Sequence, residues 1–226
     1  GNRSISSRSG AADVLENLGA KMDLTAEQNE TVLKKTDMCF MFAPVYHSSM
    51  RYAAPVRKEL GVRTVFNILG PLSNPAAAKM QLLGVYDKNL APALAQVLSN
   101  LGVTRGVAVC GDDGLDEITL TGKTYVNEIR NGEIISYTIT PEQFGLKSCE
   151  LSELIGGTPK ENARRILTCE ETGPKRDVIL MNAGMSLYLG IDGITLAEGI
   201  EKAKEMIDSG KAYAKLQEFV KATQEA

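Results

Sequence analysis

The sequence predicts an α/β fold, with a mostly parallel central sheet flanked by helices and a short antiparallel hairpin insertion. Strand-length and helix-length apolar segments alternate between residues 80 and 111, the pattern of a parallel crossover unit. The continuous apolar run 38–46 would need cover on both faces, so it suits a strand in a buried sheet. The dipeptide Asn131-Gly132, within the alternating stretch 118–140, is a strong hairpin signal.

The remaining elements follow from periodicity and boundary residues. Capping-box spacing marks three helix starts, because a Ser or Thr followed three residues later by Glu or Gln satisfies exposed N–H groups. These pairs are Thr25 with Gln28, Thr158 with Glu161, and Thr195 with Glu198. Apolar periodicity predicts further elements: helices at 11–18, 49–61, 89–102 and 211–225, strands at 80–87 and 105–111, and a turn within 63–77. The segment 177–189 is apolar on nearly every face, which predicts a helix buried inside the domain. Since no repeat or linker interrupts the pattern, we expect one domain over residues 1–226.

Composition argues against several classes of function. The 25 basic and 28 acidic side chains give a net charge of −3, which disfavours a nucleic-acid surface. No apolar run reaches membrane-spanning length, and no signal peptide is visible. Four cysteines lie far apart and the chain has one histidine, so a zinc site is not expected. We therefore expect a cytoplasmic protein with reduced thiols.

Four carboxylates follow the predicted strand 105–111: Asp112, Asp113, Asp116 and Glu117. Ligands of open α/β sheets bind at the carboxyl ends of strands, where this loop would lie. Because the carboxylates repel one another, a magnesium ion carried by phosphate oxygens would suit them. A solvated acidic turn is the alternative, and composition alone favours it.

The opening stretch, "GNRSISSRSG", is a Gly/Ser/Arg loop that leads into a helix. Hydroxyls, backbone N–H groups and a helix start favour a phosphate or diphosphate, and Arg3 and Arg8 add charge. An unstructured terminus explains the composition equally well.

Two further candidate residues lie beyond the opening loop. Arg57, in an apolar stretch, carries a planar guanidinium suited to binding a carboxylate. His47 follows the apolar run 38–46 and either contacts a substrate or has a structural role, and the second is the commoner case.

Three stretches, "GNRSISSRSGAADVLENLG", "HSSMRYAAPVRKELGVRTVFNILGPLSNPA" and "DGLDE", closely resemble the anthranilate phosphoribosyltransferase family. The resemblance covers essentially the whole chain, and "RDVILMNAGMSLYL" agrees with it. It implies a magnesium-dependent, homodimeric enzyme of tryptophan biosynthesis. The implied reaction moves a phosphoribosyl group from phosphoribosyl pyrophosphate (PRPP) to the amine of anthranilate and releases pyrophosphate. Pyrimidine nucleoside phosphorylases share the architecture, so an enzyme of that kind stays an alternative.

The resemblance also assigns site residues. Asp116 and Glu117 match the magnesium ligands. Asn2 and Arg57 match positions that bind anthranilate, and Arg57 would pair with the carboxylate of anthranilate. No general base is implied, because an aromatic amine is already neutral at pH 7. The residues that match PRPP contacts are Gly1, Asn2, Arg3, Ser4, Ile5, Ser6 and Ser7.

Two departures from the family pattern affect what we expect of the isolated chain. Ala11 occupies a position where the family often has a serine that contacts phosphate. The family's Gly-Thr-Gly-Gly-Asp loop and the lysine and histidine before Gly1 are not in the chain. We therefore expect a carboxy-terminal fragment that folds alone but does not transfer a phosphoribosyl group. A catalytically dead scaffold is the remaining alternative.

Overall fold

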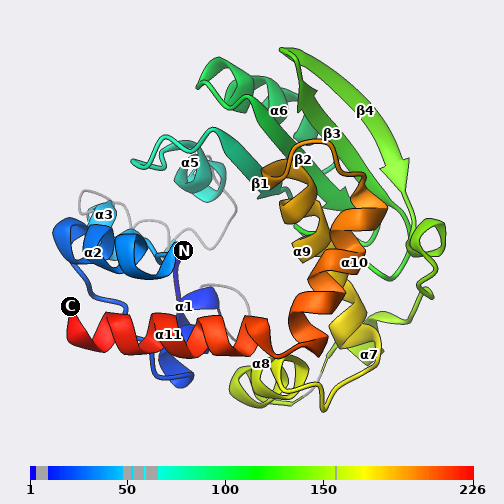
Figure 1. Ribbon diagram of the computed structural model, residues 1–226. Helices are drawn as coiled ribbons and strands as arrows, with labels where there is room; N and C mark the ends of the chain where they lie inside the picture. Colours follow the sequence, from blue (N-terminus) through cyan, green and yellow to red (C-terminus); the bar gives the residue numbers. More distant parts are fainter. Residues whose placement is uncertain (4–9, 48–51, 53–58, 60–65, 156) are drawn as a thin grey trace. The chain divides into compact units, whose positions relative to one another are not determined.

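The computed structural model describes residues 1–3, 10–47, 52, 59, 66–155 and 157–226 (Figure 1). The chain forms two compact units. The first comprises Gly1–Asn67, Gly157–Glu170 and Ile207–Ala226, and the second comprises Ile68–Gly156 and Glu171–Met206. The expectation that they make one domain stays a prediction.

The described strands lie in the middle of the chain, with one helix between the first two of them and further helices before and after the group. The strands are β1 (Met80–Gly84), β2 (Arg105–Gly111), β3 (Thr124–Arg130) and β4 (Glu133–Ile139). The helices are α1 (Ala11–Asn17), α2 (Ala26–Thr36), α3 (Ala43–Tyr46), α5 (Phe66–Leu72), α6 (Ala91–Asn100), α7 (Leu151–Leu154), α8 (Pro159–Leu167), α9 (Pro174–Gly190), α10 (Leu196–Asp208) and α11 (Lys211–Glu225), with a 3₁₀ turn, η2, at Pro141–Phe144. The predicted strands at 80–87 and 105–111 and the helices at 11–18, 89–102 and 211–225 are confirmed, and so are all three capping boxes.

The second unit is built on a four-stranded sheet with the order β1-β2-β3-β4 (Figure 1). Strands β1 and β2 are parallel and are joined through α6, so the crossover unit is confirmed. The pairs β2–β3 and β3–β4 are antiparallel. The α/β class is therefore confirmed, but the described sheet is less parallel than expected. The reason is that the hairpin joins the edge of the sheet at β2 and supplies half of its strands.

The hairpin turn has the backbone that its sequence predicts. Asn131 and Gly132 both have positive φ, 52° and 82°. These values fit a type I′ turn, whose twist matches that of the two flanking strands.

Helices α6 and α9 cover opposite faces of this sheet. Ile129 of β3 packs in a core cluster with Ala91, Leu94 and Leu98 of α6. Because side chains alternate along a strand, Glu128 lies on the other face, where Tyr188 of α9 donates a hydrogen bond to it. Strand β2 is accordingly buried along nearly its whole length.

The first unit is helical in its described part. Helices α2 and α11 pack together, and Phe219 of α11 is fully buried in a cluster with Leu24 and Val32. Gln28 at the start of α2 donates a hydrogen bond to the carbonyl of Ala226, 2.8 Å away. The amphipathic face predicted for 211–225 therefore covers the core of this unit.

Two expectations about buried segments need correction. The run 38–46 is not a strand: residues 38–42 have no regular structure and 43–46 form α3. Among the described residues, Gly1 forms two backbone hydrogen bonds with this run, one with Met41 and one with Ala43. Two bonds are too few to pair the run as a strand of a sheet. Helix α9 is not buried all round, since Ile179 is 39% exposed while Met181 and Met185 are buried. The helix predicted at 49–61 lies outside the described residues except for residues 52 and 59. Of the stretch 63–77, residues 63–65 lie outside them as well, Phe66–Leu72 form α5, and the predicted turn follows at residues 73–76.

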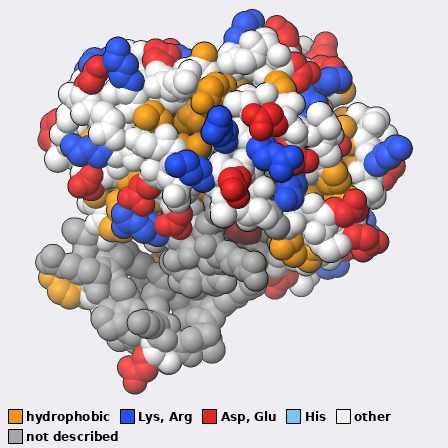
Figure 2. Space-filling model, turned by 90° about the horizontal axis from the view of Figure 1, so that it is seen from below, with side chains coloured by type: hydrophobic (Ala, Val, Ile, Leu, Met, Phe, Trp, Pro, Cys, Tyr) orange, Lys and Arg blue, Asp and Glu red, His pale blue; other side chains and the backbone are white. Residues whose placement is uncertain are grey.

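The described surface carries acidic and basic side chains side by side, as one face shows in Figure 2. Several form pairs along one helix, such as Lys34 with Glu30 at 2.6 Å and Lys215 with Glu218 at 2.7 Å. Because water and salt screen such exposed pairs, they contribute little to stability. All four cysteines are free thiols, as expected. Among the described residues, no helix has both the length and the apolarity to cross a membrane.

Candidate functional site

The acidic loop lies where the strand pattern predicted it. Residues 112–123 connect the carboxyl end of β2 to β3, next to the carboxyl end of the parallel strand β1. The carboxyl ends of neighbouring parallel strands are the usual place for ligands in an open α/β sheet. The structure then separates the four carboxylates into two kinds.

Asp113 and Asp112 are engaged within the protein. The carboxylate of Asp113 accepts hydrogen bonds from the hydroxyls of Thr119 and Thr121, at 2.6 and 2.5 Å, and from the N–H of Leu115 at 3.0 Å. Partial burial opposes ionisation, but these donors outweigh it and lower the pKa of Asp113 below its ordinary value.

Asp112 has partners on β3 and near α6. Its carboxylate accepts a hydrogen bond from the Tyr125 hydroxyl at 2.8 Å, and the Lys88 ammonium is 3.9 Å away. The Lys88 ammonium also lies over the Tyr125 ring, 4.7 Å from its centroid. Both carboxylates therefore stabilise the loop itself.

Asp116 and Glu117 are different. Their carboxylates form no hydrogen bond or ion pair with any other described residue. The hydrogen-bond donors in and next to the loop bond to Asp112 and Asp113 instead. Although Glu117 as a residue is exposed, part of the water around its carboxyl is lost, and this, with the charges of Asp116 and Asp113, raises the pKa of Glu117 above its ordinary value. Two adjacent carboxylates with free acceptor oxygens can hold a cation.

The backbone that carries these two carboxylates is fixed on both sides. Before them, the N–H of Gly111 donates to the carbonyl of Leu115 at 2.9 Å. After them, Ile118 is fully buried, and the side chain of Asn182 bonds both its N–H and its carbonyl. Beneath them, the carbonyl oxygen of Asp116 lies over Gly84, at the end of β1, so closely that a Cβ there would be 1.6 Å from it.

This donor set fits magnesium bound with phosphate. Within the part of the chain that the structure describes, no group of three or more His, Cys, Asp or Glu side chains could hold a metal ion. Magnesium commonly takes one or two carboxylates and completes its shell with phosphate oxygens and water. Asp116 and Glu117 would supply that share.

The opening residues belong to the first unit. Gly1 donates to the carbonyl of Met41 and accepts from the N–H of Ala43, both at 2.8 Å. A Cβ on Gly1 would lie 2.2 Å from the end of the Phe40 ring, so a larger residue there would require that ring to move. The Asn2 carbonyl accepts from the N–H of Ala12 at 3.2 Å, which holds the opening residues beside α1.

Arg3 has partners that sequence reasoning missed. Its guanidinium donates to both carboxylate oxygens of Glu16 on α1, at 3.1 and 2.5 Å. It also lies over the Phe42 ring, 4.7 Å from the centroid. Arg3 therefore ties the loop to α1 and to residue 42, whereas the resemblance assigned it to PRPP. The spacing of 13 residues between Arg3 and Glu16 gave no local signal of this pair.

Several predicted site residues lie outside the described residues: Ser4, Ile5, Ser6, Ser7 and Arg57. His47 is described. It ends α3, with its N–H donating to the carbonyl of Ala43 at 2.8 Å, which is a structural role for its backbone. The structure thus brings Asp116 and Glu117 together in one loop, and it places Gly1, Asn2 and Arg3 in the other unit.

Comparisons with known proteins define the class first. Residues 1–213 match the family model described as "Glycosyl transferase family, a/b domain". The fold and this match define the α/β domain of a glycosyl transferase. The anthranilate phosphoribosyltransferase of Endomicrobium trichonymphae is 56% identical over 228 residues, covering 100% of this chain and 68% of the relative.

Two solved structures narrow the family. Anthranilate phosphoribosyltransferase from Thermus thermophilus is 42% identical with a TM-score of 0.91, over 99% of this chain and 67% of that chain. The enzyme from Saccharomyces cerevisiae, in complex with PRPP and Mg, is 34% identical with a TM-score of 0.90, over 100% of this chain and 64% of that chain. The chain belongs to the anthranilate phosphoribosyltransferase family. It spans about two thirds of the length of these relatives.

Proposed function

We propose that this chain is the α/β part of an enzyme that transfers a phosphoribosyl group from PRPP to the amine of anthranilate and releases pyrophosphate. The observation that carries the proposal is the division of carboxylates in the loop after β2. Asp112 and Asp113 have internal partners, while Asp116 and Glu117 have none among the described residues. Family membership supports the same pair as the magnesium ligands.

Asp116 and Glu117 would hold Mg²⁺ together with the diphosphate of PRPP. When bound, the ion would supply positive charge that offsets the negative charge developing on the diphosphate as its bond to the ribose carbon breaks. The protein's own contribution is to keep the two carboxylates in place before substrate arrives, so that no reorganisation is needed during the reaction. The anchored backbone at Leu115, Ile118 and Gly84 supports this role.

The opening loop would contact PRPP through Gly1, Asn2, Arg3 and the four residues from Ser4 to Ser7. We assign the backbone of Gly1 and the side chain of Asn2 to direct contact. Arg3 would contact PRPP and also hold the loop, since Glu16 accepts two hydrogen bonds from its guanidinium. Asn2 and Arg57 would bind anthranilate, with the guanidinium of Arg57 pairing with the carboxylate. No side chain needs to act as a base, since the amine is neutral at pH 7.

The experiment joins this chain to the third of the Endomicrobium trichonymphae relative that it does not span, and we call the product the completed enzyme. The assay follows the loss of anthranilate fluorescence with excess PRPP while Mg²⁺ is varied. Asp116→Asn combined with Glu117→Gln should lower turnover by about 100-fold or more, because charge stabilisation in the transition state is lost. Asp112→Asn is the matched control, and its turnover should stay within a few-fold of the unsubstituted enzyme.

Three results would contradict the proposal or its parts. Normal magnesium-dependent turnover in the double variant would remove Asp116 and Glu117 from the site. Phosphorolysis of a pyrimidine nucleoside without consumption of anthranilate would favour the phosphorylase alternative. Full turnover by the chain alone would contradict the expectation that the isolated fragment is inactive.

We also propose that the protein works in the cytoplasm as a homodimer. The four free cysteines support a reducing compartment, and the homodimer rests on the resemblance to the family. Cell fractionation and light scattering of the completed enzyme test the two statements separately.

A further inference from the structure

We propose that Asn182 of α9 is a positioning residue that sets where Asp116 and Glu117 lie, a role that nothing in the acidic motif itself indicates. The inference rests on the proposed function, which gives the two carboxylates their task. It concerns a residue on another element, far along the chain from Glu117.

The side-chain amide of Asn182 forms hydrogen bonds with both backbone polar groups of the buried residue Ile118. Its Oδ1 accepts from the N–H of Ile118 at 3.0 Å, and its Nδ2 donates to the carbonyl of Ile118 at 2.8 Å. This two-way pairing fixes the amide orientation, since an N–H can meet only the oxygen and a carbonyl only the nitrogen. Ile118 is 0% exposed, so water cannot replace either bond.

Ile118 directly follows Glu117, and its position therefore limits where that carboxylate can lie. On the other side of the pair, Leu115 is held by the N–H of Gly111, at 2.9 Å, and by Asp113. Both of those anchors lie within the loop or at the end of β2. Asn182 thus adds hydrogen bonds from outside the loop to the close packing of Asp116 on Gly84, and it connects the carboxylates to α9.

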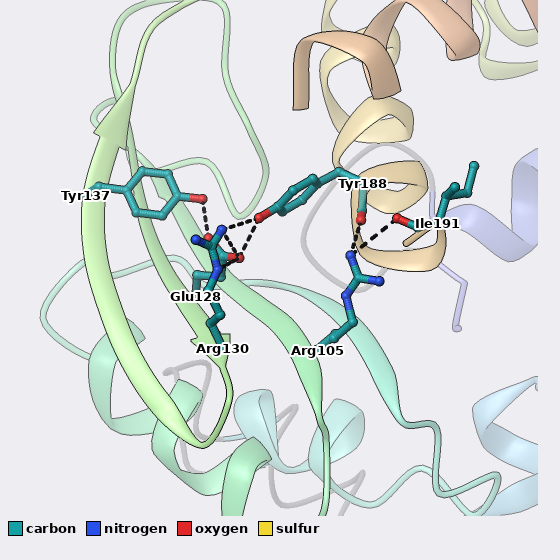
Figure 3. Close-up of polar contacts among 6 residues, drawn as sticks. All are labelled: Arg105, Glu128, Arg130, Tyr137, Tyr188 and Ile191. Atoms are coloured by element: carbon teal, nitrogen blue, oxygen red, sulfur yellow. Dashed lines mark hydrogen bonds and ion pairs between the residues drawn. The ribbon is translucent and has the colours of Figure 1, made fainter. Parts of the chain in front are cut away.

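Helix α9 is itself held firmly to the sheet, as Figure 3 shows. The hydroxyl of Tyr188 donates to the buried carboxylate of Glu128 at 2.7 Å, and Tyr137 of β4 donates to the second oxygen at 2.9 Å. Arg105 of β2 donates to the carbonyl of Tyr188 at 2.6 Å. Asn182 lies six residues before Tyr188, about 9 Å along the helix. The anchor therefore rests on a helix that cannot shift easily.

Close packing on α10 adds to this rigidity. A Cβ on Gly184 would lie 2.8 Å from the backbone nitrogen of Ile200, and one on Gly199 would lie 2.4 Å from the carbonyl oxygen of Gly184. The two helices approach each other closely at these glycines, and Gly184 is two residues from Asn182. Groups that hydrogen-bond a metal ligand directly typically change metal affinity by about 10–100-fold when they are removed. Asn182 acts one step further out, on the backbone of Ile118 next to Glu117, so we expect an effect toward the low end of that range.

The test uses the 226-residue chain itself, with three variants. Asn182→Ala removes both bonds to Ile118 and the bond from Nδ2 to the Val178 carbonyl within α9, and Asn182→Asp keeps an oxygen for the Ile118 N–H but loses the donor. Asn127→Ala is the matched control: it removes another hydrogen-bonded Asn of the same unit, whose Oδ1 accepts from Ser136 at 2.8 Å on the sheet. The readouts are amide hydrogen exchange at Ile118 by NMR and binding of Mn²⁺, as a probe for Mg²⁺, with inorganic pyrophosphate.

In Asn182→Ala, the Ile118 amide should exchange about tenfold faster, the change expected from losing one hydrogen bond. Binding of Mn²⁺ with pyrophosphate should weaken by about tenfold or more. Asn182→Asp should keep the Ile118 amide protected, and Asn127→Ala should leave both readouts unchanged relative to global stability. An unchanged Ile118 amide in Asn182→Ala would overturn the inference, as would equal changes in Asn127→Ala. If the unsubstituted chain binds no Mn²⁺, the metal-binding part of the proposed function fails for this chain, and the exchange readout alone decides the role of Asn182.

Discussion

Replacing Gly84 with alanine should displace the backbone carbonyl of Asp116, the first of the two proposed magnesium ligands. The added Cβ would lie 1.6 Å from the Asp116 oxygen and 2.6 Å from its carbonyl carbon. Ordinary van der Waals contact begins at about 3.4 Å, so the carbonyl would have to move by about 1.8 Å. Neither atom is the far end of a flexible side chain, and the loop itself must move.

Such a shift exceeds what a phosphate site tolerates. A misplacement of about 1 Å can lower a rate by about 100-fold, so Gly84→Ala in the completed enzyme should lose at least that much turnover. Overpacking should also destabilise the chain by about 1–3 kcal/mol. For a chain of this length that corresponds to a fall in Tm of roughly 2–12 °C.

Gly122 provides the matched control. It lies in the same loop, its φ is not positive, and nothing lies within 4 Å of a Cβ built there. Gly122→Ala should therefore leave turnover unchanged and alter Tm by no more than a few degrees. The assays are anthranilate consumption for turnover and thermal unfolding of the chain for stability. If Gly84→Ala leaves both values unchanged, the close approach of Asp116 to β1 is wrong. If Tm falls but turnover does not, the position of the Asp116 carbonyl does not matter for the reaction.

Two further predictions concern single charges. Glu117→Gln should raise Tm at pH 8 but not at pH 4. The pKa of the Glu117 carboxyl is raised in the folded state, so its ionisation lowers the stability of the fold at pH values above that pKa. This cost disappears below the pKa of the unfolded chain, about 4.5, where the carboxyl is protonated in both states. Thermal unfolding at the two pH values measures it, and an equal gain at pH 4 would contradict the cause. Arg57→Ala should raise the KM for anthranilate by roughly 30–150-fold, the equivalent of about 2–3 kcal/mol for a lost charge-assisted pair. With Lys58→Ala as control, an equal rise in the KM for PRPP would indicate a structural role instead.

The elements that the sequence predicted well are those specified by neighbouring residues. Strand 105–111 is bounded by its own apolar run, and Asn131-Gly132 selects its turn from backbone preference alone. The run 38–46 was predicted wrongly because a strand also needs a partner along its length, and hydrophobicity does not supply one. An apolar run of this kind fits a half-buried irregular segment just as well.

The sequence could locate the candidate site but could not show which of its carboxylates have partners within the protein. The motif placed four carboxylates at a strand end, yet nothing in it said which two would be engaged by Thr119, Thr121, Tyr125 and Lys88. Those partners come from the far side of the loop, from β3 and from the segment before α6. The Asn182 anchor had a weak signal, a polar residue within the otherwise apolar run 178–185, but its target could be found only from the fold.

The division among the four carboxylates links stability to function. Asp113 contributes to stability, because its donors lower its pKa, whereas Glu117 reduces stability when ionised, because its pKa is raised. Two carboxylates side by side would repel each other and separate if their backbone were free to relax. Gly84 beneath the loop and Asn182 beside it prevent that relaxation. A bound cation would remove the repulsion, so the loop is more favourable with its ligand than without it, which is the arrangement expected of a preorganised site.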